Sequence, residues 1–308
     1  MTAGELNDAI RTGEIGELIR VAESRQRKRL SKIADAICAR DGVRLILLAG
    51  ASAAGKTTTA KRLATQLRVN ERTVLSLSTD DYFVGDDETP KDENGELDYE
   101  HVECVDIPAL VRDLSALFRG ESIPVRRFDF VHHLPVVTEK TLSLPANGYV
   151  ILEGIHALNP RLTVGIAEAQ KYRVFVEPQP SLEVFLDLKQ KPSGARFLRR
   201  MVRDNTFRKL DPATTVKLWP KVLAGEEKWI EPFVAGADAT FDSYLVYELA
   251  VLKPFVGGLL EKARRTLGEL PEIVKMIRLL ELVKQVEPTL VPGDSIIRET
   301  IGGSQLEY

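Results

Sequence analysis

The sequence predicts an α/β fold, in which helices flank a parallel sheet, and two observations lead to that class. Short apolar runs of strand length alternate along the chain with longer segments whose apolar residues recur every three or four positions. The first apolar run, at residues 44–49, leads into a glycine-bracketed loop and then into a helical pattern at residues 58–68. A strand, a tight loop and a helix in this order begin an open sheet whose ligands bind at the carboxyl ends of the strands.

The loop between these two elements is a complete G-x-x-x-x-G-K-[ST] motif. Its glycines let successive backbone N–H groups point inward at phosphate oxygens, and the following helix adds the positive end of its dipole. Lys56 reaches the β- and γ-phosphates, and the Thr57 hydroxyl is placed to ligate Mg²⁺. A plain turn before a helix is the alternative, but all the fixed positions are present. We therefore expect a nucleoside triphosphate at Gly50, Ala51, Ser52, Ala53, Ala54, Gly55, Lys56 and Thr57.

Length and composition limit the classes of function. A chain of 308 residues has room for one α/β domain of about 200 residues and further helices. The net charge of −3 gives no reason to expect nucleic-acid binding, and no apolar run approaches the ~18 residues of a membrane span. The first 20 residues are too acidic for a signal peptide. Cys38 and Cys104 lack metal-binding spacing and are expected to be reduced, buried thiols. We expect a cytoplasmic enzyme.

Helical patterns flank the expected main domain on both sides. Residues 1–40 carry apolar residues at three- and four-residue steps, which predicts an N-terminal extension of one or two amphipathic helices packed on the body. The main domain is expected over residues 41–253. Residues 254–308 repeat the helical periodicity, interrupted at residues 257–258, and form the expected C-terminal helical extension. This extension has no chemical interpretation, and docking on the body and formation of a homo-oligomer are both open.

Carboxylates follow two of the predicted strands. The strand at residues 72–78 is followed by Asp80 and Asp81 and then by two aromatic residues. One Asp in this position is commonly a turn cap, but the pair at the ligand-binding edge favours a functional role. The apolar strand at residues 149–153 ends in Glu153, where a phosphate-loop protein carries the acid that orients Mg²⁺ or its water.

The segment between these strands predicts smaller elements. Residues 85–100 are strongly acidic and read as a solvated loop, with metal binding as the alternative. Residues 105–118 predict a helix, and residues 123–130 and 140–144 predict two strands of a small hairpin outside the main sheet. Adjacent side chains diverge, so His132 and His133 are poor ligands for one metal, and one of them is expected to face a substrate.

The later part of the chain predicts two more strands, at residues 172–177 and 237–243, and a helix at residues 214–233. Between them, residues 189–209 hold eight Lys or Arg and a single acid, Asp204. A nucleic-acid patch is one interpretation. Next to a phosphate loop, a helical lid that closes over the triphosphate is favoured, because the transferred phosphoryl group needs cationic neighbours. The arginines at helix-compatible spacing are Arg196, Arg199, Arg200, Arg203 and Arg208.

The order of six motifs carries a resemblance to a known family. They are the phosphate loop, T-D-D-Y-F at residues 79–83, Y-E-H at 99–101, F-D-F-V-H-H at 128–133, L-E-G-I at 152–155 and R-R-M-V-R-D at 199–204. Over residues ~43–253 the chain resembles the uridine kinase/phosphoribulokinase family of P-loop kinases. The resemblance implies a P-loop NTPase-type sheet, a β-hairpin insertion at the acceptor site, and ATP and Mg²⁺ as cofactors.

The same resemblance assigns roles to individual residues. It implies that Asp80 is the base that accepts the proton of the substrate hydroxyl, and that Asp80, Thr57 and Glu153 hold Mg²⁺. It implies a catalytic role for Lys56 and Arg203, and it adds Thr58, Arg200 and Arg208 to the ATP site. The implied acceptor-binding residues are Glu100, Phe128, Phe130, His133 and Arg200.

Three positions depart from the uridine kinase pattern, and all three belong to the acceptor site. Glu100 stands where an aspartate is usual, Phe128 where a tyrosine is usual, and Leu210 where a second arginine would follow Arg208. We expect a kinase of a small-molecule hydroxyl, most closely a nucleoside 5′-hydroxyl, with a sugar, sugar phosphate or polyol as the alternative acceptor. A nucleotide-sensing protein without catalysis is the alternative from another class. A GTPase switch would need an Asn-Lys-x-Asp tetrapeptide, which the sequence lacks.

Overall fold

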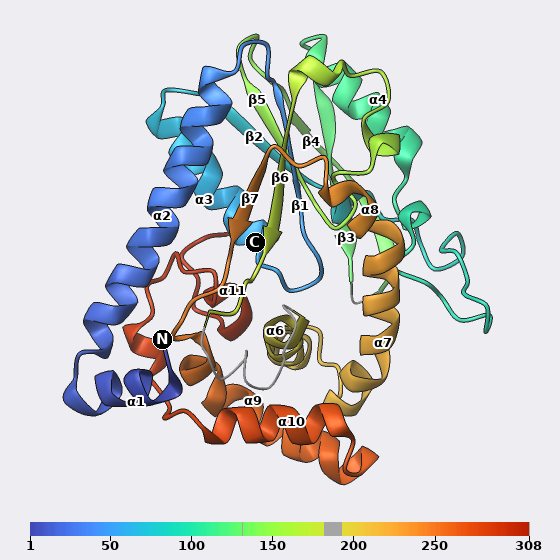
Figure 1. Ribbon diagram of the computed structural model, residues 1–308. Helices are drawn as coiled ribbons and strands as arrows, with labels where there is room; N and C mark the ends of the chain where they lie inside the picture. Colours follow the sequence, from blue (N-terminus) through green and yellow to red (C-terminus); the bar gives the residue numbers. More distant parts are fainter. Residues whose placement is uncertain (131, 182–192, 308) are drawn as a thin grey trace.

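The computed structural model describes residues 1–130, 132–181 and 193–307, and its centre is a parallel sheet (Figure 1). The five strands lie in the order β2, β5, β1, β6, β7, and every neighbouring pair is parallel. Their bounds are Leu45–Ala49 for β1, Val74–Ser78 for β2, Tyr149–Glu153 for β5, Lys171–Glu177 for β6 and Ala239–Asp242 for β7. The predicted α/β class is confirmed.

Helices cover both faces of this sheet, which is why its central strands are apolar on both sides. The covering helices are α2 (Ile15–Ala39) and α3 (Lys56–Val69) on one face and α4 (Ile107–Phe118) on the other. Within β1, Ile46 and Leu48 pack in the cluster of α2 and α3, whereas Leu45 and Leu47 pack in the cluster of α4. Because the strands run in the same direction, their carboxyl ends form one edge, which lies at the lower side of the sheet in Figure 1.

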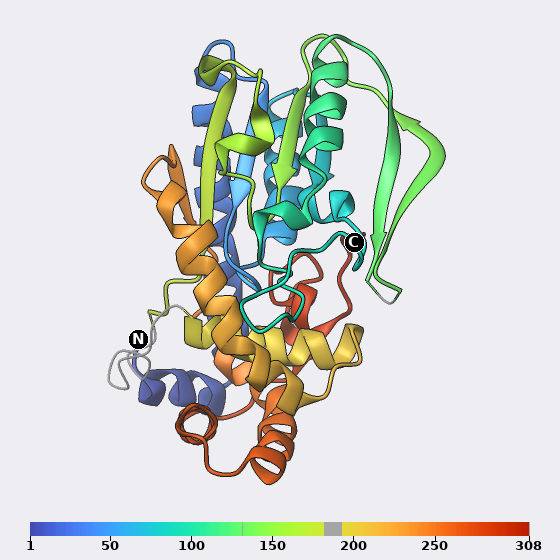
Figure 2. The ribbon, with the colours of Figure 1, turned by 90° about the vertical axis from the view of Figure 1, so that its right-hand side faces the viewer.

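A helical layer lies beyond that edge (Figures 1 and 2). The remaining helices of the described residues are α1 (Ala3–Thr12), α6 (Ser193–Phe207), α7 (Pro212–Trp229), α8 (Glu231–Val234), α9 (Glu248–Leu267), α10 (Pro271–Glu281) and α11 (Arg298–Ile301). One apolar cluster joins α1 and the first half of α2 to α6, α7, α9 and α10. The two terminal segments therefore pack together, and residues 1–40 form two helices, within the predicted number.

Helix α9 corrects one expectation of the sequence analysis. Residues 257–258 do not interrupt the helix, which runs from Glu248 to Leu267 through Pro254 as well. Proline has no N–H to donate to the carbonyl four residues earlier, and here the Val286 N–H takes that carbonyl of Ala250 at 3.0 Å. The buried apolar face of α9 and this replacement bond outweigh the low helix propensity of proline and glycine.

The hairpin stands apart from the main sheet, as Figure 2 shows. It consists of β3 (Ile123–Asp129) and the antiparallel β4 (Leu134–Leu142). The expected second strand at residues 140–144 was placed too late, because β4 already begins at Leu134. Most side chains of β4 are exposed, so the strand has no alternation of apolar and polar residues that a sequence pattern could reveal.

Short 3₁₀ turns connect these elements, at η1 (Thr79–Tyr82), η2 (Val102–Cys104), η3 (Pro160–Thr163), η4 (Glu168–Gln170) and η5 (Pro288–Leu290). Both cysteines are free thiols. Cys104 is buried as expected, whereas Cys38 is only partly buried, because it lies in the last turn of α2 beside the Asn70 side chain. Among the helices of the described residues, none is long and apolar enough to cross a lipid bilayer.

Candidate active site

The phosphate loop bends tightly between β1 and α3. A Cβ atom at Gly50 would collide with the Val176 carbonyl oxygen of β6, and Gly55 has a left-handed φ of +87°. Both positions therefore require glycine. Gly55 is the N-cap residue of α3 and has no side chain, so the first-turn N–H groups of α3 are left to other partners. The Lys56 ammonium reaches back over the loop and donates to the Ala51 carbonyl at 3.3 Å.

The carboxylate at the end of β5 meets the first turn of α3. The Thr57 hydroxyl donates to Glu153 Oε1 at 3.1 Å, and the Ser78 hydroxyl at the end of β2 donates to the same atom at 3.0 Å. Burial and the charge of Asp80 raise the pKa of Glu153 to about 7, while Lys56 lowers it. Three neighbouring strands thus bring one buried carboxylate, a second carboxylate and two hydroxyls to the same corner.

The two aspartates after β2 have different surroundings. Arg127 of the hairpin donates to the Asp81 carboxylate at 3.0 Å. The Asp80 N–H donates to the Ser78 hydroxyl at 3.3 Å, which fixes the backbone of η1, but its carboxylate has no hydrogen bond or ion pair with the described residues. A Cβ atom at Gly154 would collide with the Thr79 hydroxyl, so η1 packs directly on the end of β5. The pair is therefore divided into one carboxylate held by the hairpin and one open to a ligand.

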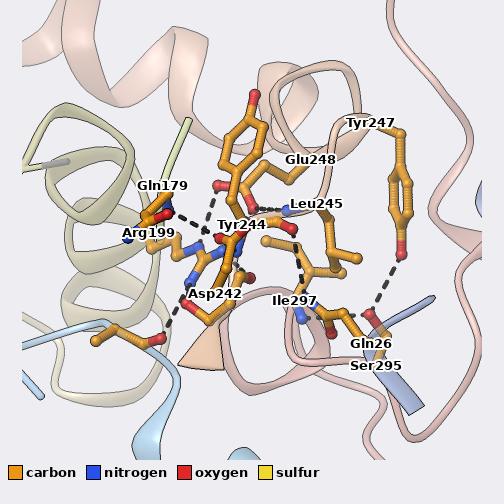
Figure 3. A network of polar contacts seen from close by, with 12 residues as sticks. Gln26, Gln179, Arg199, Asp242, Tyr244, Leu245, Tyr247, Glu248, Ser295 and Ile297 are labelled. Carbon is orange, nitrogen blue, oxygen red and sulfur yellow. Dashed lines mark hydrogen bonds and ion pairs between the residues drawn. The ribbon is translucent and has the colours of Figure 1, made fainter. Parts of the chain in front are cut away.

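The arginines of the expected lid, residues 189–209, fall into two groups. Arg196 donates to the Glu226 carboxylate of α7 at 2.6 and 2.9 Å, and Arg199 pairs with the Glu248 carboxylate of α9 at 2.5 Å. Figure 3 shows Arg199 turned toward Glu248 and the end of β7, inside the helical layer. Both arginines are buried, and their ion pairs anchor α6 to the helices around it. The spacing of arginines in the sequence could not separate these structural arginines from arginines that face a ligand. Residues 189–192 of the expected lid lie outside the described residues, and closure of α6 stays a prediction.

The second group shares one buried carboxylate beside the phosphate loop, a loop that Arg196 and Arg199 also contact through the carbonyls of Ser52 and Ala54, each at 3.4 Å. Arg200, Arg203 and Arg208 share the fully buried Asp204, at 3.2, 2.8 and 3.8 Å. Arg200 also donates to the Ser52 hydroxyl of the phosphate loop at 2.7 Å. The charge of Arg203, more than burial, lowers the pKa of Arg208 to about 10. Three cations around one carboxylate leave excess positive charge next to the loop, which suits a polyanionic ligand.

The expected acceptor residues lie on the other side of these arginines. Glu100 is mostly buried, with its carboxylate 3.8 Å from Arg200 Nη1. Burial raises the pKa of Glu100, and the charge of Arg200 opposes that rise. A Cβ atom at Gly225 of α7 would collide with Glu100 Cβ, so α7 presses against this residue. Glu100 is therefore held in place rather than free at the surface.

Aromatic side chains form the rest of that side. Phe128 and Phe130 of the hairpin lie edge to face at 5.0 Å between ring centroids, and the guanidinium of Arg208 lies 5.0 Å from the Phe130 ring. Phe83, at the end of η1, contacts both rings. Phe130 is half-exposed, so it is the ring among them that a ligand can reach.

His133 belongs to a small polar cluster that sequence reasoning missed. Its Nδ1 lies 3.0 Å from the Tyr99 hydroxyl and 3.1 Å from Asp86 Oδ1, and the Tyr99 hydroxyl donates to Asp86 at 2.7 Å. His132 instead pairs with Asp129 in the hairpin turn. Asp86 and Tyr99 come from the acidic loop that the sequence analysis read as solvated. Among the described residues, no group of three or more His, Cys, Asp or Glu side chains is arranged to hold a metal ion.

Comparison with known proteins places this geometry in a wider context. The model of the family described as Phosphoribulokinase / Uridine kinase family matches residues 45–247. A uridine kinase of Lactobacillus johnsonii is 27% identical over 164 residues, which are 53% of this chain and 69% of that protein. A uridine kinase of Deinococcus deserti is 29% identical over 173 residues, 56% of this chain and 74% of that protein. A solved structure titled as a possible uridine kinase from Bacillus stearothermophilus is 19% identical, with a TM-score of 0.46, over 70% of this chain and 98% of that chain.

Proposed function

The chain belongs to the phosphoribulokinase/uridine kinase family and is a phosphate-loop kinase of a small metabolite, and we propose that its acceptor is the 5′-hydroxyl of a nucleoside. The observation that supports this proposal is the meeting of three groups at one corner of the sheet edge. The phosphate loop supplies Lys56 and Thr57, β5 supplies Glu153, and η1 supplies an aspartate, Asp80, whose carboxylate is open to a ligand.

ATP fits the residues around the loop. The first-turn N–H groups of α3 and the Lys56 ammonium suit the β- and γ-phosphates. Arg200, bonded to Ser52, and the neighbouring Arg203 and Arg208 would add positive charge around the transferred group. Arg203 is assigned to the charge that develops on the phosphoryl group in the transition state.

Mg²⁺ fits the corner between α3 and β5. Mg²⁺ prefers oxygen ligands and binds through one or two carboxylates while keeping several waters. Thr57, Glu153 and Asp80 offer one hydroxyl and two carboxylates. Burial and, second to it, the charge of Asp80 raise the pKa of Glu153, and a divalent cation would relieve the repulsion between the two carboxylates. These three residues would hold the ion, which when bound neutralises charge on the β- and γ-phosphates.

Asp80 is assigned as the general base. In the proposed step the acceptor oxygen attacks the γ-phosphorus, its proton moves to the Asp80 carboxylate, and the bond to the β–γ bridging oxygen breaks to release ADP. The neighbouring Asp81 is already paired with Arg127 of the hairpin, so its carboxylate is less free to turn toward an acceptor.

The acceptor is placed between Glu100 and the hairpin. The Glu100 carboxylate, held by α7, would accept hydrogen bonds from vicinal ring hydroxyls, and Arg200 beside it would orient them. Phe128, Phe130 and His133 would contact the remainder of the acceptor. A sugar, sugar phosphate or polyol kinase is the second candidate, because Phe128 and Leu210 remove two polar groups found in the uridine kinase pattern.

The test is ADP formation by the purified chain with ATP and Mg²⁺, against a panel of nucleosides, sugars, sugar phosphates and polyols. The expected result is turnover with a nucleoside and a 5′-monophosphate product by mass spectrometry. Turnover with a sugar or polyol alone would establish the second candidate. ATP binding without turnover for any acceptor would favour a nucleotide-sensing protein. The Asp80→Asn variant serves as the control for contaminating kinases.

A further inference from the structure

The end of the chain lies on the phosphate loop, although its sequence carried no chemical interpretation. The tail segment, residues 294–301, includes the short helix α11. Ile296 is 1% exposed, and a Cβ atom at Gly55 would lie 2.7 Å from its Cγ2. The cavity left between the loop, α6 and the tail segment measures about 10 Å³, no more than one water molecule needs. The tail segment therefore contacts the loop directly.

Glu299 of this segment occupies a donor in the first turn of α3. Its Oε2 accepts from the Thr58 N–H at 3.2 Å and from the Thr58 hydroxyl at 2.7 Å. Thr58 is the third residue of α3, within the first turn, where N–H groups lie before the ladder of bonds inside the helix begins. Such first-turn N–H groups are the donors that bind phosphate at the N-terminus of a helix. A carboxylate of the same chain thus takes a donor that belongs to the expected ATP site.

The surrounding contacts hold Glu299 at this position. The Tyr247 hydroxyl lies 3.3 Å from the Ser295 hydroxyl (Figure 3). It donates to Glu23 of α2 at 2.6 Å, and all three residues are buried. Arg298, next to Glu299, donates to the carbonyls of Pro288 at 2.8 Å and Val291 at 2.6 Å. These bonds tie the tail segment to α2 and α9 on one side and to its own preceding turn on the other. The position of Glu299 follows from that framework.

We propose that the tail segment is an intrasteric gate on the nucleotide site, in which the Glu299 carboxylate and a nucleotide phosphate compete for the first turn of α3. The proposal rests on the ATP site proposed above. Two anions cannot accept the same N–H at hydrogen-bond distance, so the tail segment must move before the polyphosphate is fully bound. The apparent affinity for nucleotide is then reduced by the fraction of molecules in which the tail segment is displaced.

Calorimetric titration of ADP, with Mg²⁺, into the wild type and the Glu299→Gln variant tests the gate. The glutamine keeps the shape and loses the charge, so we expect ADP to bind about tenfold more tightly. Glu287→Gln is the matched control, since Glu287 is an exposed carboxylate of the same C-terminal region at the start of η5, and its affinity should equal that of the wild type. Thermal unfolding of the free proteins checks that both variants fold.

Weaker binding by Glu299→Gln would make Glu299 a ligand of the nucleotide and overturn the gate. Equal affinity of all three proteins for ADP would mean that Glu299 only caps the helix, and it would also overturn the gate. No binding by any of them would instead reject the proposed ATP site.

Hydrogen–deuterium exchange of the wild type gives a second test that needs no variant. A gate predicts faster exchange in residues 294–301 when ADP is bound. Slower exchange there would mean that the tail segment closes on the nucleotide, which contradicts the proposal.

Discussion

The Thr57 hydroxyl donates to the Glu153 carboxylate at 3.1 Å, and this bond joins the first turn of α3 to the end of β5. The register of the sheet brings Thr57 and Glu153 together. Strand β1 leads into the phosphate loop and pairs directly with β5, with Leu48 opposite Glu153. The proposed Mg²⁺ corner is therefore a consequence of strand order.

The first prediction concerns Glu153→Gln. The substitution keeps the hydrogen bonds from Thr57 and Ser78 but removes a buried charge, so the melting temperature without ligand should be unchanged or higher. Turnover should fall ~10²-fold or more, because the Mg²⁺ corner loses a carboxylate. Differential scanning fluorimetry and a steady-state assay measure the two effects. A large loss of stability with normal turnover would show that Glu153 supports the fold and not the metal.

The second prediction concerns Asp80→Asn. Asparagine has the same shape but cannot take the acceptor's proton, so kcat should fall ~10²–10⁴-fold while the affinity for ATP changes little. Asp81→Asn is the matched control. It loses only a partly exposed pair with Arg127, and such pairs contribute little to stability. If Asp81→Asn lowers kcat far more than Asp80→Asn, the two roles are reversed.

The third prediction concerns Gly154→Ala. The new Cβ would collide with the Thr79 hydroxyl and push η1, which carries Asp80, away from the end of β5. Activity should fall ~10²-fold because a small displacement of a catalytic group is costly. Gly257→Ala is the control. Its Cβ has free space in the middle of α9, so stability should rise by about 0.5–1 kcal/mol at normal activity. Normal activity of the Gly154→Ala variant would show that Gly154 is not needed to position Asp80.

The sequence allowed the sheet and the ligand-binding edge to be predicted because both follow from local patterns. Apolar runs mark β1 and β5, and Lys56, Asp80 and Glu153 follow strands whose carboxyl ends meet. The start of β4 could not be predicted, because an exposed strand has no apolar alternation.

Contacts between segments that are distant in the sequence could not be predicted either. Arg199 pairs with Glu248, 49 residues away, and Glu299 bonds to Thr58, 241 residues away. No spacing along the chain encodes such pairs, because they depend on how the helical layer packs. The continuation of α9 through Pro254 has the same origin, since its replacement donor comes from Val286.

The fourth prediction concerns acid sensitivity through His156. This side chain is 1% exposed, and burial, with smaller effects from His101 and Lys56, lowers its pKa from 6.5 to about 4. Between these values the unfolded chain binds the proton and the folded chain does not, so stability is lost as the pH falls from 6.5 to 4. Protonation of His156 in the unfolded chain lowers the free energy of unfolding by about 3 kcal/mol at most. Urea unfolding at several pH values should show a shallower loss for His156→Gln than for the wild type. Equal slopes would mean that His156 is not protonated on unfolding in this range.

The last prediction concerns the acceptor and Glu100. Its carboxylate is mostly buried, 3.8 Å from Arg200 and pressed by α7 at Gly225, so it presents fixed oxygens to the proposed acceptor site. Glu100→Gln removes the charge that vicinal hydroxyls would bind, and hydrogen bonds to charged groups are worth about twice those to neutral ones. We therefore expect the KM of an acceptor with vicinal hydroxyls to rise about tenfold, with little change in kcat or in the KM of ATP. Glu103→Gln, an exposed carboxylate three residues away that pairs with Arg161, is the matched control.

A comparison of acceptors completes this test. Sites built around hydrogen bonds to a base reject analogues strongly, because their own polar groups are left unpaired. Phe128 and Leu210 remove two such groups relative to the uridine kinase pattern, so uridine and cytidine should not be strongly preferred over other hydroxyl-bearing acceptors. A kcat/KM for uridine near ~10⁶ M⁻¹s⁻¹, within the range of well-adapted enzymes, with all other acceptors orders of magnitude lower, would contradict this expectation. In that case the exposed ring of Phe130 would have to supply the selectivity by stacking.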